Sequence, residues 1–366
     1  MDKTFYIITA IVFLVNFSLA FMPYFTRKTE SFGVSIPEKV YNDSEFRSLR
    51  KQYATITVLI NGLIIILFYS SISFVSETTL MTLFIVATIL YLLSCFLVYL
   101  PFHYKMKRIK VREAWHEVHE QRVVVDTTFH REKTYVSYKW YIIPFFIVIV
   151  TVAYTFLVYD QIPDEVPIHT SFSGKVTYDE KSIGNLLILP FSQLFLLGTM
   201  LIVQYVINHS KQQISAENPE RSKRQVVLFR RYWSLYLVIS TYLITFMFSG
   251  LQLTFIYPDL LGYEDYVIWP VIAFLLIGAI VLSIRTGQGG SRMKIDSKRE
   301  ANVMDRDDDQ YWKLGQFYVN KNDPSIFVEK RFGVGWTNNW AHPISWILLL
   351  SLIGLGLVIP LLFIYL

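Results

Sequence analysis

The chain has 366 residues, of which 53% are hydrophobic and 17% charged, and it carries a formal net charge of +5. A soluble domain has roughly 25% charged residues, so this composition argues against a water-soluble protein. The single cysteine, Cys95, excludes an intrachain disulfide.

Long uncharged stretches alternate with charged ones along the chain. A helix needs about 20 apolar residues to cross the hydrocarbon core of a bilayer. Eight stretches meet or nearly meet this length: 4–26, 52–76, 78–104, 140–159, 182–210, 232–257, 266–284 and 343–366. The sequence therefore predicts an all-α integral membrane protein with about eight transmembrane helices. The first stretch is too long for a signal peptide and has no cleavage site of small residues, so we expect it to be a true span.

The basic residues predict how these spans are oriented. Of the 34 Lys and Arg residues, 31 lie in four loops, which carry six, nine, six and ten of them. Because positive residues stay on the cytoplasmic side, these four loops should face inward and both termini outward. The positive charge thus indicates orientation in a membrane, and we expect no nucleic-acid partner.

We expect the cytoplasmic segments to hold small modules with short β-hairpins. Within 106–139, residues 107–122 suggest a basic amphipathic helix with Val111, Trp115 and Val118 on one side, and residues 123–138 suggest a hairpin. His103 and its neighbours are interpreted as surface histidines and not as a metal site. Within 285–342, Gly287, Gly289 and Gly290 suggest a mobile linker before an aromatic module.

Two further patterns concern these cytoplasmic segments. Asp305 and Asp307–Asp309 form an acidic cluster, which we interpret as solvated and not as a Mg²⁺ site. Phe32-Gly33-Val34 after the first span is echoed by Phe332-Gly333-Val334 before the last. The echo is either a true repeat or a chance similarity.

On the outer side only the loop 160–181 is sizeable. Pro163, Pro167 and Gly174 predict a turn-rich structure. Its five acidic residues and His169 suggest a divalent-cation or titrating site, with simple solvation as the alternative.

Chemistry inside the spans is limited to uncharged polar groups. The predicted spans contain no Asp, Glu, Lys or Arg, and we find no phosphate loop, nucleophile elbow or zinc-protease motif. We therefore expect a protein that is not an enzyme and has no cofactor and no metal. Asn16, Asn61, Gln193 and Gln252 should hydrogen-bond between helices, although a transporter would use them to line a cavity.

Two segments resemble known families. Residues 140–190 resemble the domain of unknown function 1648 family, the N-terminal domain of SdpI-type bacterial immunity proteins. A second segment, 308–343, resembles another short family of unknown function found before a last span. The residues that carry the first resemblance, and form a candidate outer-loop site, are Pro163, Pro167, His169, Gly174 and Lys181. Those that carry the second, and form a candidate cytoplasmic site, are Trp312, Gly315, Tyr318, Asn320, Arg331, Gly333, Trp336 and Asn339.

The resemblance implies a bacterial cytoplasmic membrane protein, because some relatives protect bacteria against a secreted membrane-active toxin and sequester a repressor. It suggests envelope-stress sensing or immunity, with the bilayer, an extracellular peptide or lipid, and a cytosolic protein as partners. The alternative is a transporter or lipid-handling protein. The chain should divide into six regions. They are a three-span N-terminal membrane region, 1–105, with cytoplasmic loop 27–51; a cytoplasmic basic segment, 106–139; a two-span region with the outer loop, 140–210; a basic loop with spans six and seven, 211–284; a cytoplasmic linker and aromatic module, 285–342; and the last span, 343–366.

Overall fold

A computed structural model describes residues 3–115, 120–122, 132–170, 176–295, 303–305, 307–351 and 353–354 of the chain. In this part of the chain, seven helices are long and apolar enough to cross a membrane. They match the first seven predicted stretches and confirm a helical membrane architecture. The eighth predicted span, 343–366, lies largely outside the described residues.

Three of these helices extend by eight or more residues beyond one end of the apolar stretches that predicted them. Helix α3 (Ser44–Ser71) begins before its uncharged stretch, α4 (Glu77–Glu113) continues beyond it, and α8 (Pro219–Ile256) also starts early. Proline is favourable in the first helical turn, and the side chain of Asn218 caps α8 by accepting from the backbone N–H of Arg221 at 3.2 Å.

The amphipathic helix predicted for 107–122 is wrong, because α4 simply continues to Glu113. The helix ends at Ala114, whose left-handed backbone (φ 45°) places its N–H against the carbonyl of Lys110. Trp115 is buried, whereas Val111 is 77% exposed, so the two do not share a buried side. The hairpin predicted for 123–138 falls mostly on residues outside the described part.

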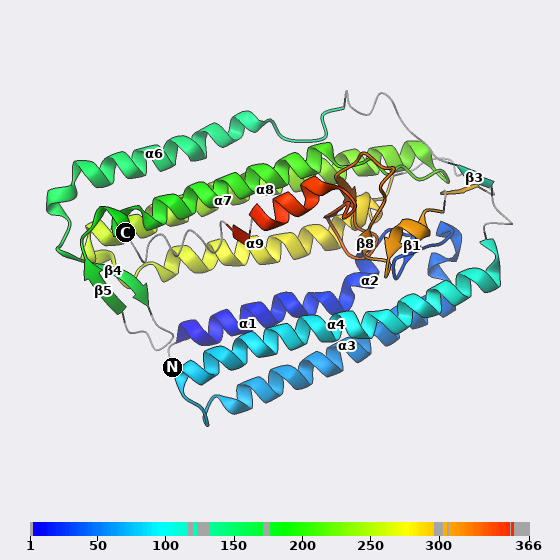
Figure 1. Cartoon of the computed structure of the whole chain (residues 1–366), viewed down its shortest axis with the longest axis horizontal. Helices are drawn as coiled ribbons and strands as arrows, with labels where there is room; N and C mark the ends of the chain where they lie inside the picture. The colour runs from blue at the N-terminus through cyan, green and yellow to red at the C-terminus, as the bar shows by residue number, and fades with distance from the viewer. Residues whose placement is uncertain are drawn as a thin grey trace. The chain divides into compact units, whose positions relative to one another are not determined.

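The chain forms two compact units, each assembled from separate segments. The first unit comprises residues 1–132, 210–229 and 283–342, and its helices α1 (Lys3–Ser18), α3 and α4 pack together (Figure 1). Its remaining elements are short: η1 (Leu19–Phe21), α2 (Met22–Phe25), β1 (Glu30–Ser31), β2 (Val34–Ser35), η2 (Glu38–Asn42), β3 (Glu120–Arg122), η7 (Gln288–Gly290), β6 (Val303–Asp305), η8 (Asp309–Tyr311), β7 (Trp312–Lys313), β8 (Phe317–Tyr318), β9 (Phe327–Glu329) and β10 (Trp336–Asn338).

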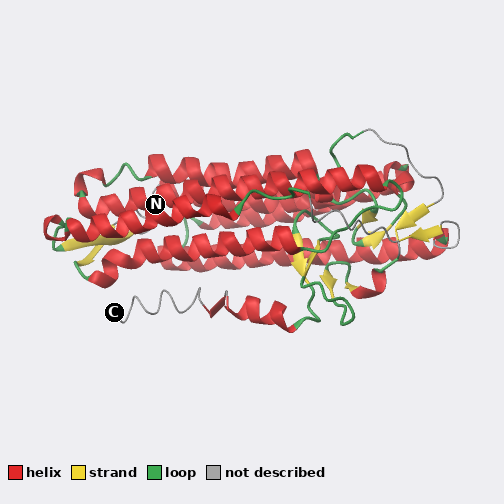
Figure 2. Cartoon of the chain, turned by 90° about the horizontal axis from the view of Figure 1, so that it is seen from above, coloured by secondary structure: helices red, strands yellow, loops and turns green. Residues whose placement is uncertain are grey.

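The described residues form five two-stranded sheets, one of which is the hairpin of β4 (Glu165–Thr170) and β5 (Val176–Glu180). Four are antiparallel, namely β1–β2, β4–β5, β7–β8 and β9–β10, and β3 pairs with β6 in parallel. The short strands of the first unit gather at one end of α3 and α4, where β1, β3 and β8 are labelled in Figure 1. In Figure 2 strands are drawn in yellow, and most of them gather at one end of the helices. Together these strands build a small module. It lies at the end of α3 and α4 where the basic residues are concentrated.

The second unit comprises residues 133–209, 230–282 and 343–366. Its elements are η4 (Tyr138–Tyr141), α6 (Ile142–Leu157), η5 (Tyr159–Gln161), β4 (Glu165–Thr170), β5 (Val176–Glu180), α7 (Ile183–His209), most of α8, η6 (Pro258–Leu260) and most of α9 (Asp265–Thr286). The β4–β5 hairpin connects α6 to α7.

Three of the four polar side chains predicted to bond between helices do so, whereas Asn16 is buried and its Nδ2 has no hydrogen-bond partner within the described residues. Gln193 of α7 donates to the carbonyl of Thr245 at 2.8 Å, and Gln252 of α8 donates to the carbonyl of Leu186 at 3.0 Å. Asn61 accepts from the hydroxyl of Ser94 at 2.8 Å between α3 and α4. Asn61, Gln193 and Gln252 therefore have partners in the helix packing.

Apolar side chains cover the outside of the same helices. Leu59 and Ile66 of α3 are 67% and 66% exposed, and Leu157 of α6 is 81% exposed. Because soluble proteins rarely expose contiguous apolar surface of this kind, lipid is the natural solvent for these faces.

Candidate functional site

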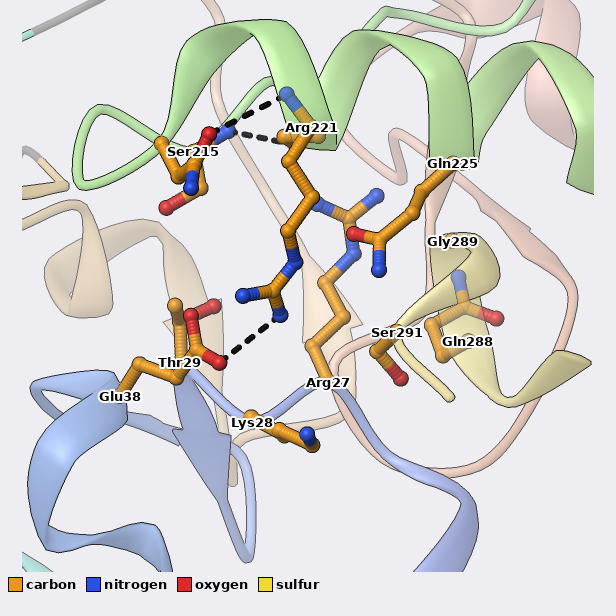
Figure 3. A pocket seen from close by; sticks show the side chains of 12 residues that line it. Arg27, Lys28, Thr29, Glu38, Ser215, Arg221, Gln225, Gln288, Gly289 and Ser291 are labelled. Atoms are coloured by element: carbon orange, nitrogen blue, oxygen red, sulfur yellow. Dashed lines mark hydrogen bonds and ion pairs between the residues drawn. The ribbon is translucent and has the colours of Figure 1, made fainter. Parts of the chain in front are cut away.

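A small polar cavity lies where the chain leaves the first span (Figure 3). Arg27 pairs with Glu329 of β9 and donates to the carbonyl of Gln213 at 2.9 Å. Arg221 of α8 pairs with Glu38 at 2.9 Å. Each guanidinium thus has a carboxylate partner, and the two ion pairs fix the loop 27–38 to β9 and to α8.

The glycine-rich segment that follows α9 is packed and not a mobile linker, so that prediction is wrong for its glycines. Gln288, Gly289 and Gly290 are buried in η7. Gln288 accepts from the backbone N–H of Gly335 at 2.7 Å and donates to its carbonyl at 2.9 Å. The glycines are needed because side chains of neighbouring segments leave no room for a Cβ.

The motif Phe32-Gly33-Val34 forms the tip of the β1–β2 hairpin. Ser31 pairs with Val34, which leaves Phe32 and Gly33 as the two turn residues. Both have positive φ, 46° and 75°, as a type I′ turn requires. A positive φ is uncommon for phenylalanine, so packing must hold this turn in place.

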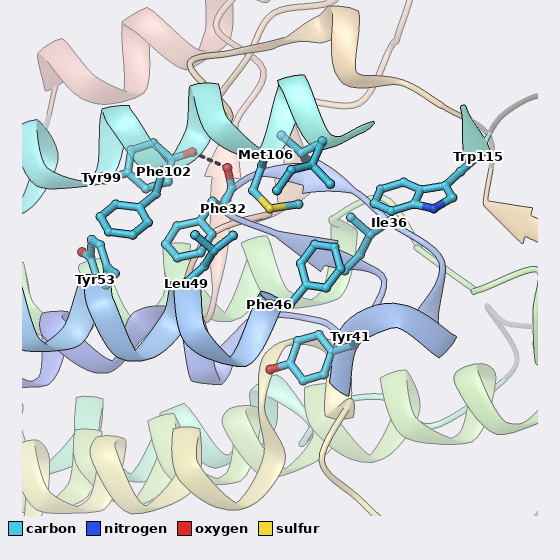
Figure 4. Close-up of a cluster of buried hydrophobic side chains, with 12 residues drawn as sticks. Phe32, Ile36, Tyr41, Phe46, Leu49, Tyr53, Tyr99, Phe102, Met106 and Trp115 are labelled. Atoms are coloured by element: carbon cyan, nitrogen blue, oxygen red, sulfur yellow. Dashed lines mark hydrogen bonds between the residues drawn. The ribbon is translucent and has the colours of Figure 1, made fainter. Parts of the chain in front are cut away.

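That packing is an aromatic core around Phe32 (Figure 4). The ring of Phe32 lies 5.6 Å from that of Tyr53 and 5.2 Å from that of Phe102, measured between centroids. The Phe32 carbonyl accepts from the hydroxyl of Tyr99 at 3.0 Å and from Nδ1 of His103 at 2.8 Å. His103 is 1% exposed, so its interpretation as a surface histidine is wrong.

Two glycines allow the β1–β2 hairpin to approach the turn between β7 and β8. A Cβ on Gly33 would lie 2.7 Å from Cα of Gly315, and a Cβ on Gly315 would lie 2.7 Å from Nδ1 of His103. Real Cβ atoms do not come this close to other atoms. Both positions also have positive φ, so glycine meets a steric and a conformational requirement at once.

Arg331 is the buried cation of the module. It is 2% exposed and pairs with Asp308 and Asp309, and it donates to the carbonyl of Gly33 at 3.3 Å. Its guanidinium lies 5.2 Å from the ring centroid of Trp312. The side chain therefore joins the β1–β2 hairpin to the start of the aromatic module.

Lys110 at the end of α4 is the second cation of this cluster. Its ammonium lies 2.8 Å from Asp307 and 2.6 Å from Asp309, whose carboxylate also accepts from the backbone N–H of Ser35 at 3.2 Å. The prediction of a solvated acidic cluster is wrong for these residues, because their carboxylates neutralise buried cations.

The ion pair changes the acidity of Asp307. Burial acts to raise the pKa of this carboxyl, but the hydrogen bonds from Lys110 and from the backbone N–H of Asp309 outweigh it. The net effect holds the pKa of Asp307 below its usual range, so the carboxylate stays charged and paired with Lys110.

A second polar network lies between β8 and the segment before β9. Asp323 accepts from the hydroxyl of Tyr318 at 2.7 Å and pairs with Lys211 at 2.6 Å. Asn339 donates to the carbonyl of Asn320 at 2.8 Å and to that of Asp323 at 3.1 Å. Burial acts to raise the pKa of Asp323, but the hydrogen bonds that its carboxylate accepts from Lys211, Tyr318 and Ser325 lower it to about 2.

The remaining predicted module residues pack around the two networks. Trp312 lies 5.1 Å from Tyr318 and Trp336 lies 5.4 Å from Phe229 of α8, between ring centroids. A Cβ on Gly333 would meet the sulfur of Met22 at 2.6 Å. All eight residues of the candidate cytoplasmic site thus belong to one unit, and most of them support its packing.

The two Phe-Gly-Val segments contact each other. The rings of Phe32 and Phe332 stack with centroids 6.1 Å apart, and Arg331 reaches the carbonyl of Gly33. Whether the echo is a repeat stays open, but the similar segments share one core.

The candidate outer-loop site forms part of the β4–β5 hairpin. Lys181 donates to the carbonyl of Ile162 at 2.9 Å and lies 4.9 Å from the ring centroid of Tyr159. Pro167 pairs with Tyr178, and the register shifts between Pro167 and His169. Pro163 precedes β4. The side chain of His169 and the whole of Gly174 lie outside the described residues.

Sequence reasoning missed Tyr99 and Lys110 as parts of the cytoplasmic site. Tyr99 lies in an apolar span, and Lys110 is one of nine cations in its loop, so neither carries a distinguishing local signal. Only the tertiary structure brings them against Phe32 and Asp309.

Two family models match the chain. Residues 146–194 match the domain of unknown function DUF1648, and residues 321–346 match the family of unknown function DUF5808. The matches cover α6, the β4–β5 hairpin and part of α7 in the first case, and β9 and β10 in the second. They confirm the resemblance to the domain of unknown function 1648 family. No curated protein matches the chain, and no solved structure does.

Proposed function

We propose that this protein is a non-enzymatic sensor or immunity protein of a bacterial cytoplasmic membrane. In this proposal the β4–β5 hairpin faces outward and meets a membrane-active peptide or a lipid. The module around Arg331 faces the cytosol and contacts a protein partner, and both termini lie outside. The DUF1648 match of the hairpin region and the positive charge of the opposite loops support this orientation.

Helix α8 is the observation that carries the proposal. At its outer end Phe255 and Ile256 pack against Val166 of the hairpin strand β4. In its first turns Gln225 donates to the carbonyl of Met293 at 2.8 Å, and Phe229 contacts Trp336. One unbroken helix thus touches the hairpin with one end and the aromatic module with the other.

Helix α8 contributes residues to both units, and in this proposal it passes on a displacement. A peptide that moves the hairpin would shift the residues that pack on it, and the first turns of α8 would respond at the module. In this proposal the module is a binding module, so the response would be a change in what it binds.

The decisive experiment is gene deletion followed by exposure to a panel of membrane-active peptides. We expect the deletion strain to be more sensitive to at least one peptide, and the wild-type gene to restore resistance. The variant His169→Ala changes the hairpin and should fail to restore it. The matched control is His209→Ala, because this exposed histidine lies at the other end of α7.

Two outcomes would contradict the proposal. Unchanged sensitivity of the deletion strain across a broad panel would remove the protective role. Full complementation by His169→Ala would remove the hairpin histidine from it. Immunoblots of membrane fractions must show that both variants accumulate as the wild type does.

A further inference from the structure

A second cavity of the first unit is strongly basic. It has a volume of about 330 Å³ and lies beside the polar cavity of Figure 3, with which it shares Lys28 and Ser291. Its lining contains four cationic side chains, Lys28, Arg47, Arg50 and Arg292, and no carboxylate. Uncompensated cations around one cavity are typical of a site for an anion.

Arg50 is a built part of this cavity and not a mobile surface residue. It is 4% exposed, donates from Nη2 to the carbonyl of Tyr41 at 2.9 Å, and lies 4.0 Å from the centroid of the Tyr41 ring. Its other terminal nitrogen, Nη1, is buried and has no hydrogen-bond partner within the described residues. A buried cation with an unused donor is costly unless an anion compensates it.

Arg292 is held in a similar way from the other side of the cavity. It donates to the carbonyl of Tyr24 at 2.7 Å and to that of Ile284 at 3.0 Å, and it lies 5.1 Å from the centroid of the Phe25 ring. Backbone carbonyls orient both guanidinium groups but do not neutralise them.

The neighbouring cavity shows the contrast. There Arg221 pairs with Glu38 (Figure 3) and Arg27 pairs with Glu329 of β9, so internal carboxylates satisfy both guanidinium groups. In the basic cavity neither Lys28 nor Arg47 makes an ion pair with a described residue. No carboxylate of the described residues lines this cavity to neutralise its positive charge, so the charge is available to bind an anionic ligand.

The cavity also lies at the ends of membrane spans. Tyr24 belongs to the span Phe5–Phe25, Arg50 to the first turns of α3, and Arg292 follows the span Asp265–Gly290. The headgroup phosphates of a bilayer lie at this depth. Basic pockets beside span ends on the positively charged side match acidic lipid headgroups.

We propose that this cavity binds a phosphate group, and that its ligand is the phosphodiester headgroup of an acidic phospholipid. Arg50 and Arg292 would hold the phosphate oxygens in fixed positions, and Lys28 and Arg47 would add charge. This inference does not depend on the proposed sensor function.

The test compares lipid binding by the full-length protein in detergent, by native mass spectrometry and thermal stability. The probes are phosphatidylglycerol, phosphatidylcholine and inorganic phosphate. We expect the wild type to bind phosphatidylglycerol preferentially. Lys28→Gln and Arg47→Gln should each weaken this binding roughly fivefold, which corresponds to about 1 kcal/mol per cation. The matched control Lys51→Gln removes an exposed charge from α3 outside the cavity lining and should have little effect.

Any other result rejects either the site itself or a lipid as its ligand. Equal binding of the two lipids, or equal losses for Lys51→Gln and Arg47→Gln, would reject the site. Protection by inorganic phosphate at the concentrations that suffice for phosphatidylglycerol would reject the lipid and leave a soluble phosphate compound as ligand. Arg50→Gln is avoided because its carbonyl contact also supports the fold.

Discussion

Arg331 shows how a buried cation can organise a module made of short strands. It has three carboxylate partners, of which Glu30 is the most distant at 3.9 Å, and a backbone carbonyl and an aromatic face within reach. Desolvation of a charge is costly, and these partners offset the cost only together. Removing the cation would leave Asp308 and Asp309 beside an apolar core.

The variant Arg331→Met should therefore destabilise the protein by about 3–5 kcal/mol, as expected when one partner of a buried pair is removed. Thermal unfolding in detergent, followed by tryptophan fluorescence, measures this loss. Arg112→Met is the matched control, because Arg112 is exposed and solvent screens its pairs with Glu45 and Glu113. Similar stabilities of the two variants would contradict a central role for Arg331.

Asp323 predicts a pH dependence of stability. Its folded-state pKa of about 2 is below the usual value for aspartate, so its stabilising effect is present above pH 4. This effect, about 2 kcal/mol, is lost as the pH falls from 4 towards 2. Comparing acid unfolding of the wild type with that of Asp323→Asn isolates the contribution. Parallel curves for the two proteins would exclude it.

At the level of single residues, the sequence predicted which residues belong to the module but not which residues they contact. The aromatic content and the resemblance identified Trp312, Tyr318 and Arg331 as members of one module. The same reasoning assigned Asp309 to the solvent, because a run of carboxylates outside the spans is usually solvated. Lys110 lies 199 residues away along the chain, so local pattern could not reveal the pair.

Among the elements, the β1–β2 hairpin depends on close approach between backbones. Gly33 and Gly335 both have positive φ, 75° and 112°, but only a Cβ on Gly33 would meet neighbouring atoms. Comparing substitutions at Gly33 and Gly335 therefore separates the steric requirement for glycine from the conformational one.

Gly33→Ala should be more destabilising than Gly335→Ala. Both variants introduce backbone strain of about 1–3 kcal/mol, but only Gly33→Ala also forces the hairpin away from Gly315 and Tyr99. Thermal unfolding of both variants in detergent tests the order. Equal losses would mean that the hairpin can move away from the β7–β8 turn without cost.

The helices could be predicted from the sequence, and their ends could not. Apolar length identified the seven spans because a bilayer imposes a minimum length on any helix that crosses it. The continuation of α4 through Lys110 to Glu113 depends on packing of its charged end against Asp307 and Asp309. These ion pairs involve residues that are distant along the chain. Local hydropathy therefore cannot predict them.

For the whole molecule, the orientation predicted from charge is open to direct measurement. The native Cys95 is buried and accepts a hydrogen bond from Asn61 at 3.4 Å, so it should not react with an impermeant maleimide. Introduced cysteines at exposed positions can then report their side. We expect Glu180→Cys to be labelled in intact cells and Lys313→Cys only after the membrane is permeabilised.

Labelling of both positions from the same side would contradict the predicted topology. The unmodified chain serves as the control and should stay unlabelled under both conditions. Labelling of Glu180→Cys alone would also place the β4–β5 hairpin where the proposed function needs it.

The contact between Arg331 and Gly33 joins residues 298 positions apart, which sets an order of events during biosynthesis. A ribosome adding 5–20 residues per second needs roughly 15–60 s to supply the arginine after the glycine has emerged. Throughout that interval the tip of the nascent hairpin can pack on Tyr53, Tyr99 and Phe102 but lacks its contact with Arg331, so it is only partly protected from chaperones or proteases. A transcript truncated before codon 331 should therefore yield a product that is inserted in the membrane but rapidly degraded.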